Sequence, residues 1–394
     1  MTTTAARSYP FAPPDGLRLH PLYAYLREHE PLARVRLAHG DEAWLVTGYH
    51  NARTVLTDGR FSRAPGRDEP RPGAVPNTGI LALDPPEHTR LRRLVSQGFT
   101  ALRVEQLRAH IREVANGLVD AMVAAGPPAD LVADLAVPLP LSTMCELLGV
   151  PYADRQRLEQ WSEAILSATS LSPARIGEYV ARLRGYMRWL VRHRQSEPTD
   201  DLIGALVRAH DEGARLTARE VLDLTFGLLA VGYETTAGQI ANFAYVLREQ
   251  PDAWDQLLER PDLVPTAVEE LMRYVPNGSF ASGPRYALAD VELDGGVVRA
   301  GEPALVYVAA ANRDERVFAD PEHLDLTRSP NPHLAFGHGI HHCLGAPLAR
   351  LELQESLSAL LRAVPTLRLA VPPDQVPWKR GMFVRRPAAL PVTW

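Results

Sequence analysis

The stretch HLAFGHGIHHCLGAPLAR, residues 333–350, holds one of only two cysteines in a chain of 394 residues. Behind Cys343, leucines recur at helical spacing, which predicts an amphipathic helix over Leu344–Ala363 with the cysteine at its N-terminal edge. Backbone N–H groups at a helix N-terminus stabilise a thiolate, the glycines of the stretch allow a tight turn, and Phe336 can shield the sulfur from water. A shielded thiolate of this kind is suited to be an axial ligand of iron.

Three other roles for Cys343 remain open at this level. An isolated cysteine is most often a small buried apolar side chain, and this is the preferred interpretation of Cys145 in LSTMCELLGV. A nucleophile is another alternative, with His341 or His338 as its base. A zinc site is the third, although no second ligand cluster occurs elsewhere in the sequence. Its ligands would be His333, His338, His341, His342 and Cys343.

Composition indicates an ordinary globular protein. Hydrophobic residues make up 46% and charged residues 23%, and the net charge of −5 favours neither a nucleic-acid partner nor a membrane. Two cysteines cannot form a disulfide framework and fit a reducing cytosol. The first residues, MTTTAARSYPFAPPDG, have neither the basic nor the apolar region of a signal peptide, so we expect a cytoplasmic protein without a membrane anchor.

The order of sequence patterns predicts a mainly α fold with a minor β portion, in a single domain over residues 1–394. EAWLVTG at 42–48 reads as a strand and the segment after it as a helix, whereas residues 63–84 are rich in Pro and Gly and predict a functional loop. Residues 90–274 show helical periodicity throughout. After residue 275 short β-branched runs and Asp-Gly turns predict strands and hairpins.

One helix stands out by its length. A Thr217/Glu220 capping box and Pro251 bound a helical pattern of about 33 residues, roughly 50 Å at the standard rise. Asp223 and Glu234 interrupt its apolar run, which excludes a membrane span. We expect a helix this apolar to be the buried spine of a large helical protein.

FGHGIHHCLG, residues 336–345, resembles position for position the Phe-Gly-x-Gly-x-His-x-Cys-x-Gly motif of the cytochrome P450 superfamily. The resemblance implies that Cys343 is the thiolate that ligates haem iron. It also places Phe336 and Gly337 at the haem and His341 at a haem propionate. The likeness extends from DPPEHTRLRR to the terminal LPVTW and is with the soluble bacterial class.

AVGYETT, residues 230–236, resembles the oxygen-activation motif of that family. Gly232 permits a local distortion of the helix, Thr235 then donates a hydrogen bond during oxygen activation, and Glu234 relays protons. Val231 stands where the family has a small residue, which predicts less space over the iron. Without Cys343, the favoured interpretation would be a threonine bonded to its own helix and a surface glutamate.

Further resemblances concern the charged residues. Glu270 and Arg273 match the Glu-x-x-Arg motif of the family, and His323 stands where a third basic residue is expected, so that a protonated His323 is a candidate bridge. Haem carries two propionates that need cations or donors. The residues that match the propionate-binding positions are His88, Arg92, Arg285 and His341.

The resemblance implies the P450 fold, with haem b buried between the long distal helix and the cysteine loop. The expected activity is that of a monooxygenase, which activates dioxygen with electrons from a separate ferredoxin and ferredoxin reductase and hydroxylates or epoxidises an apolar small molecule, such as a natural-product intermediate. Oxidative coupling of an aromatic or peptide substrate by the same chemistry is the alternative, and a non-catalytic haem sensor is the alternative of a different class. We expect a monomer whose candidate docking residues are Arg93, Arg103 and Arg350.

Family analogy also predicts the walls of the substrate pocket. They would come from the loop at residues 63–84, the distal helix before Gly232, the turn after Arg273 and a segment near the C-terminus. These walls are apolar, which agrees with an apolar substrate but selects none. The candidate substrate-binding residues are Ile80, Val231, Phe280 and Phe383.

Overall fold

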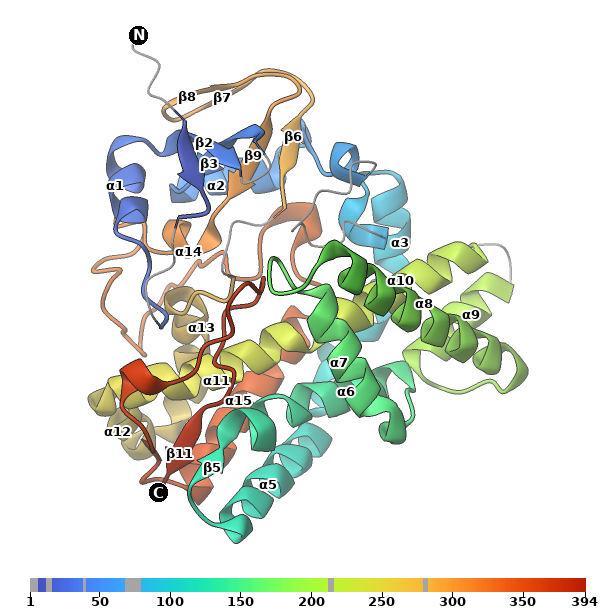
Figure 1. Cartoon of the computed structure of the whole chain (residues 1–394), viewed down its shortest axis with the longest axis vertical. Coiled ribbons are helices and arrows are strands. Elements are labelled where there is room, and N and C mark those ends of the chain that lie inside the picture. Colours follow the sequence, from blue (N-terminus) through green and yellow to red (C-terminus); the bar gives the residue numbers. More distant parts are fainter. Residues whose placement is uncertain (1–5, 12–15, 38–39, 68–78, 212–215, 279–282) are drawn as a thin grey trace. The chain divides into compact units, whose positions relative to one another are not determined.

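The computed structural model of the chain describes residues 6–11, 16–37, 40–67, 79–211, 216–278 and 283–394. The chain divides into two compact units, each formed by two separate stretches of sequence. Unit 1 comprises Met1–Asn77 and Pro265–Cys343, and unit 2 comprises Thr78–Val264 and Leu344–Trp394. Helices predominate and strands are short, as the sequence predicts (Figure 1). The assignment of residues 1–394 to a single domain stays a prediction.

Unit 1 contains a six-stranded mixed sheet in the order β1-β2-β3-β9-β6-β4. Strands β3 and β9 are parallel neighbours and join the two stretches of the unit, with Trp44 opposite Ala304. The strand expected at 42–48 is thus confirmed as β3, and the helix expected after it as α2. The strands are β1 (Arg7–Tyr9), β2 (Leu32–Leu37), β3 (Glu42–Val46), β4 (Phe61–Ser62), β6 (Arg285–Ala287) and β9 (Pro303–Val306).

The remaining elements of unit 1 are short. The Asp-Gly turn at residues 294–295 closes the hairpin of β7 and β8, which the sequence predicts. These elements are α1 (Leu22–His29), α2 (Tyr49–Thr57), η1 (Ala64–Arg67), α13 (Val264–Tyr274), β7 (Val291–Leu293), β8 (Gly296–Val298), α14 (Val308–Ala311) and η7 (Gly339–His341).

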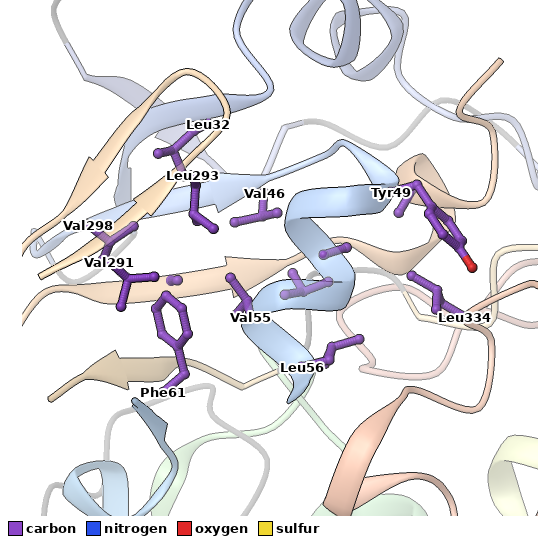
Figure 2. Close-up of a cluster of buried hydrophobic side chains, with 14 of the residues drawn as sticks. Leu32, Val46, Tyr49, Val55, Leu56, Phe61, Val291, Leu293, Val298 and Leu334 are labelled. Atoms are coloured by element: carbon purple, nitrogen blue, oxygen red, sulfur yellow. The ribbon is translucent and has the colours of Figure 1, made fainter. Parts of the chain in front are cut away.

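Alternate residues of the central strands enter two different apolar clusters. Leu45 and Leu305 belong to a cluster with residues of α1, whereas Val46 and Val306 belong to a cluster with residues of α2 and of the β7-β8 hairpin (Figure 2). This alternation follows from the two-residue period of a strand. Each fully buried aliphatic side chain contributes about 1.5–3 kcal/mol. Both faces of the sheet are therefore covered, which fixes the register of its strands.

Unit 2 is helical. Its α15 packs along α5 and α11, and α10 lies against α8. The principal helices are α3 (Glu87–Ser96), α4 (Ala101–Gln106), α5 (Arg108–Ala125), α6 (Pro138–Leu148), α7 (Arg155–Ile165), α8 (Pro173–Ser196), α9 (Leu202–Asp211), α10 (Ala218–Gly232), α11 (Glu234–Glu249), α12 (Pro251–Glu259) and α15 (Ala346–Ala363). The short turns are η2 (Gly79–Ala82), η3 (Gln97–Phe99), η4 (Val132–Ala136), η5 (Tyr152–Asp154), η6 (Pro261–Leu263) and η8 (Pro373–Gln375).

A small antiparallel sheet completes unit 2. Its order is β10-β11-β5, and β10 and β11 are among the short strands expected after residue 275. The strands are β5 (Ala129–Asp130), β10 (Arg368–Leu369) and β11 (Pro391–Thr393). Within the described ranges, no helix is both long enough and apolar enough to cross a membrane.

The long helix of the sequence analysis is two helices in the structure. Thr217 forms the expected capping box with Glu220, and Pro251 begins α12 directly after the helix ends, but α10 stops at Gly232 and α11 starts at Glu234. The intervening Tyr233 has φ −113° and is fully buried. Its hydroxyl donates to the Glu159 carbonyl of α7 at 3.0 Å, so a tertiary contact competes with the straight helix. The prediction of one continuous helix was wrong, whereas its burial is confirmed along α11.

Candidate functional site

Cys343 ends a tight loop of unit 1, the segment His333–Cys343, which we call the cysteine loop. Its backbone closes on itself: the Cys343 amide donates to the Phe336 carbonyl at 2.8 Å, and the Gly337 amide donates to the Leu334 carbonyl at 2.8 Å. Gly337 has φ +72°, in the region that favours glycine. The turn that the glycines predict is thus present, and it carries the sulfur at its end.

The surroundings of the cysteine loop require one of its glycines. Gly339 also has φ +72°, and a Cβ atom on it would lie 2.5 Å from the Leu56 carbonyl oxygen at the end of α2. The loop is also tied down at its beginning, where the Asn312 side chain accepts the Leu334 amide at 2.7 Å. Tyr49 donates its hydroxyl to the Pro332 carbonyl at 2.7 Å. The loop is therefore held rigidly against the core of unit 1.

The two cysteines have opposite environments. Cys343 is exposed, which contradicts the alternative of a small buried apolar residue and also differs from the expected shielding of the sulfur by Phe336. Cys145 lies on α6 and is 2% exposed, as expected, and burial raises the pKa of its thiol to about 11. Helix α15 begins at Ala346, three residues after Cys343, close to the predicted boundary. Within the described part of the chain, no three His, Cys, Asp or Glu side chains gather in the way that a zinc site needs.

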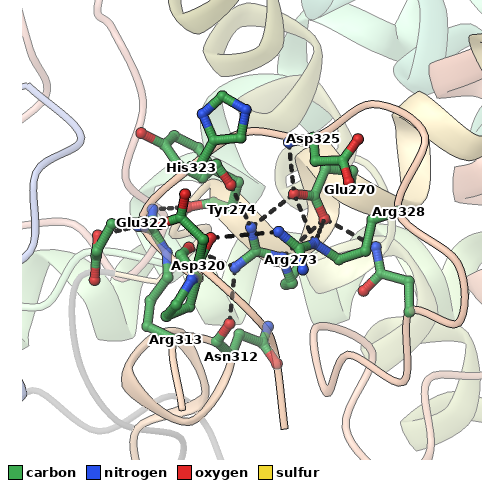
Figure 3. A network of polar contacts seen from close by, with 12 residues as sticks. Glu270, Arg273, Tyr274, Asn312, Arg313, Asp320, Glu322, His323, Asp325 and Arg328 are labelled. Atoms are coloured by element: carbon green, nitrogen blue, oxygen red, sulfur yellow. Dashed lines mark hydrogen bonds and ion pairs between the residues drawn. The ribbon is translucent and has the colours of Figure 1, made fainter. Parts of the chain in front are cut away.

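The pair of Glu270 and Arg273 lies at the centre of a buried network in unit 1 (Figure 3). The Arg273 guanidinium donates to the Glu270 carboxylate at 2.7 and 2.8 Å, and both side chains are fully buried. Arg273 also donates to the Asn312 carbonyl at 3.0 Å. The pair thus anchors the segment that in turn holds the cysteine loop.

The third basic residue of this network is Arg328 rather than His323. Arg328 Nε donates to both Glu270 oxygens at 3.1 Å, whereas His323 contributes its backbone carbonyl, which accepts from Arg273 at 3.1 Å. A turn makes this possible, because the Asp325 amide bonds to Glu270 at 3.0 Å and the Arg328 amide bonds to the Asp325 carbonyl. The expectation of a bridging His323 side chain was wrong.

In unit 2, the AVGYETT motif lies at the break between α10 and α11. The Thr235 hydroxyl is 3.4 Å from the Val231 carbonyl, which is a long hydrogen bond to its own helix. Gly232 faces α6, and a Cβ atom there would lie 2.8 Å from Met144 Cε. The predicted distortion is present one residue later than Gly232, and the Thr235 hydroxyl is only weakly held.

Glu234 is buried rather than a surface charge. Its side chain is 1% exposed, and Oε1 accepts a hydrogen bond from Arg386 Nε at 2.7 Å. Among the described residues, Oε2 has no hydrogen-bond partner. Burial lowers the pKa of Arg386 and the charge of Glu234 raises it, and the net effect is a rise. Glu234 is therefore an acid with one oxygen paired and the other able to exchange a hydrogen bond.

The charges continue from Arg386 to the surface of unit 2. Arg386 Nη2 lies 3.9 Å from Glu163 Oε2, and that oxygen is 2.6 Å from Lys379 Nζ. Glu163 and Lys379 line an open pocket of about 410 Å³. Burial, together with the charges of Glu163 and Glu234, raises the pKa of Glu159, which lies beside this row of charged side chains. Glu234 is thus connected to solvent by ionisable groups.

The four residues expected to bind propionates lie in different elements. His88 (2% exposed) and Arg92 are one turn apart on α3 of unit 2. In unit 1, Arg285 (5% exposed) begins β6, and His341 ends η7 in the cysteine loop. Buried cationic and donor side chains are what two carboxylates require inside a protein. The chemistry of these side chains therefore fits the propionates of a haem.

Two of the candidate substrate residues, Val231 and Phe383, lie close together in unit 2. Val231 packs against the apolar cluster of Leu166, Met382 and Val384. Phe383 stands between Met382 and Val384 in the sequence, and its amide donates to the Leu166 carbonyl at 3.0 Å. Ile80 lies in η2, which contacts α10. Phe280 lies outside the described residues.

Comparisons with known proteins identify the class of this chain. A family model described as Cytochrome P450 matches residues 175–390. Mycinamicin IV hydroxylase/epoxidase of Micromonospora griseorubida is 52% identical, and nocardicin C N-oxygenase of Nocardia uniformis subsp. tsuyamanensis is 50% identical, each over 100% of both chains. The crystal structure of the LnmA cytochrome P450 hydroxylase from the leinamycin biosynthetic pathway of Streptomyces atroolivaceus superposes with a TM-score of 0.92 at 50% identity, over 99% of this chain and 100% of that one.

The chain therefore belongs to the cytochrome P450 family, whose cofactor is haem, and it has the P450 fold. It is a cytochrome P450 monooxygenase. The family, the fold class and the enzyme class that the sequence predicts are confirmed.

Two residues with parts in the site were missed in the sequence. Arg386 pairs with Glu234, and Arg328 pairs with Glu270. A signal for the first was present, because FVRRPAAL places two arginines inside an apolar run, where a buried charge needs a partner. Arg328 gave no comparable signal, since it lies among polar residues in LDLTRSP.

Proposed function

We propose that Cys343 ligates the iron of haem b and that the enzyme oxidises an apolar natural-product intermediate. The observation that carries the proposal is the exposed thiol at the end of a loop whose backbone is fixed by its own hydrogen bonds and by Asn312. When bound, the haem supplies dioxygen activation and transfer of an oxygen atom to the substrate. The residues His88, Arg92, Arg285 and His341 would neutralise its propionates.

The chain's own residues supply protons and exclude water. Thr235 would donate its hydroxyl hydrogen bond toward the haem, because its bond to Val231 is long. Glu234 would pass protons from solvent towards Thr235 through Oε2, while the hydrogen bond from Arg386 to Oε1 holds the carboxyl group in place. Phe336 and the apolar cluster around Val231 would keep bulk water from the reacting atoms.

The proposed substrate class is based on the residues expected to line the substrate pocket and on the names of the relatives. Val231 lies against the apolar cluster of Leu166, Met382 and Val384, and the names of the relatives refer to mycinamicin IV, nocardicin C and the leinamycin pathway. Their reactions are a hydroxylation or epoxidation and an N-oxygenation, so about 50% identity does not fix the reaction. We propose hydroxylation or epoxidation as the reaction. Formation of a coupled product from an aromatic substrate would show that the reaction is oxidative coupling instead.

The electron donor we propose is a ferredoxin with its reductase, and the exposed arginines Arg93 and Arg103 are candidates for its docking. We propose that the enzyme acts as a monomer. The sequence holds only two cysteines, which fits a reducing compartment, so we place it in the cytoplasm.

The test is an absorption spectrum of the reduced holoprotein with carbon monoxide. We expect a strongly red-shifted Soret band in the parent and its loss in Cys343→Ser, because a serine hydroxyl cannot replace the thiolate. Cys145→Ser is the matched control, since that thiol is buried on α6, and it should keep the band. Survival of the band in Cys343→Ser would place the iron ligand elsewhere.

A further inference from the structure

Two neighbouring glutamates of α13 hold the beginning of the cysteine loop. Glu270 accepts from the Asn331 side chain at 3.0 Å, and Glu269 Oε2 lies 3.1 Å from His333 Nε2. The first contact extends the network of Arg273 and Arg328. The second is separate from it and involves a histidine of the 333–350 stretch that the functions above leave without a role.

The hydrogen bonds of His333 define its protonation. The Ala335 amide donates to Nδ1 at 3.2 Å, and a backbone N–H has no other role than donor. Nδ1 must therefore carry a lone pair, so the proton of the neutral ring is on Nε2 and is donated to Glu269. The side chain is 3% exposed, so water does not readily replace either partner.

The hydrogen bonds of His333 are connected to Cys343 through three consecutive residues of the loop. The Leu334 amide is held by Asn312 and the Ala335 amide by His333. The next residue, Phe336, presents the carbonyl that accepts the Cys343 amide at 2.8 Å. The peptide groups that set the position of the cysteine backbone are thus fixed by Asn312, which lies outside the loop, and by His333 at its beginning.

We propose that His333, held as its neutral Nε2–H tautomer between Glu269 and the Ala335 amide, positions the cysteine loop and thereby tunes the bond between Cys343 and the haem iron. The inference rests on the proposed function. His333 is a positioning residue, because it acts through the backbone of the loop. A thiolate that is held less well donates less charge to iron, which favours the ferrous form and raises the reduction potential.

The experiment compares four variants of the holoprotein by haem midpoint potential and by the rate of haem transfer to a scavenging apoprotein. His333→Leu removes both hydrogen bonds. His333→Gln can still donate to Glu269 but offers no acceptor near the Ala335 amide. His333→Asn keeps an acceptor, Oδ1, at the position of Nδ1. His338→Asn is the control in the same loop, since no described residue forms a hydrogen bond with that ring.

We expect the ratio of ferrous to ferric stability to rise about tenfold in His333→Leu and His333→Gln, which is ~59 mV for one electron. Haem transfer should accelerate in the same two variants. His333→Asn should restore most of the parent potential, and His338→Asn should match the parent. If His333→Leu does not take up haem, the comparison of His333→Gln with His333→Asn decides alone.

Parent-like potentials and transfer rates in both His333→Leu and His333→Gln would overturn the inference. So would a shift in His333→Asn as large as that in His333→Gln, because the Ala335 bond would then not be responsible. Failure of the proposed function gives a different result: the parent itself would lack the red-shifted band with carbon monoxide, whatever residue stands at 333.

Discussion

Glu352 of α15 is a buried acid whose replacement should stabilise the protein. It is 1% exposed, and its Oε1 has no hydrogen-bond partner among the described residues. Burial raises its pKa from the ordinary 4.5 to about 8, against the opposing effect of a hydrogen bond with the Thr143 side chain. Glu352 is therefore neutral in the folded protein at pH 7 and ionised in the unfolded chain.

The magnitude follows from the two pKa values. Because the folded pKa is the higher one, the contribution of Glu352 is most favourable below pH 4.5, and stability is lost as the pH rises towards 8. Each pH unit in that window costs about 1.4 kcal/mol, so the loss at pH 7 is ~3 kcal/mol and at pH 5 it is under ~1 kcal/mol. Glu352→Gln has the same shape without the ionisation and should recover these amounts.

The assay is chemical unfolding followed by circular dichroism at pH 5 and pH 7, at equal haem occupancy. The variant should gain free energy of unfolding at pH 7 and little at pH 5. Glu355→Gln is the matched control on the same helix, because Glu355 is paired with Arg108 and Arg112, and it should gain nothing at either pH. An equal gain at both pH values, or a loss at pH 7, would refute the reasoning.

Three further changes test the charges and the hydroxyl of the site. Thr235→Ala should uncouple electron consumption from product and release peroxide; equal coupling in variant and parent would remove Thr235 from this role. Arg386→Met leaves the buried Glu234 charge unpaired and should cost about 3–5 kcal/mol in chemical unfolding. The double variant with Glu234→Gln should recover most of that loss, and additive costs would contradict the pairing. Arg328→Met should lower stability by about 1.5–3 kcal/mol, whereas His323→Asn, at a position that enters the network through its backbone carbonyl, should not.

Local patterns predicted the parts of the fold that local interactions decide. The capping box at Thr217, the helix after Cys343 and the strands around Asp294 all follow from periodicity and turn chemistry. Tyr233 shows where such reasoning ends: the motif predicted a distortion at Gly232, whereas the break lies at Tyr233, whose hydroxyl donates to the Glu159 carbonyl, 74 residues away in the chain. No local pattern contains that partner.

The candidate site divides in the same way. The resemblance to family motifs predicted Cys343, Thr235 and Glu234, because each lies in a continuous motif. Arg328 and Arg386 come from other segments, so their roles depend on which chain positions tertiary packing brings together. A histidine was expected where Arg328 acts, since sequence order alone could not show which side chain the turn at Asp325 directs inward.

Lys379 is the one lysine of the sequence, and its ammonium lies 2.6 Å from Glu163 with 17% of the side chain exposed. Acylating reagents for amines attack the unprotonated, accessible nitrogen, so this pairing protects it. Apart from the N-terminal amine, a fluorophore coupled through an activated ester would therefore reach a single defined side chain, and its rate of attachment to Lys379 would report how often the Lys379–Glu163 contact opens.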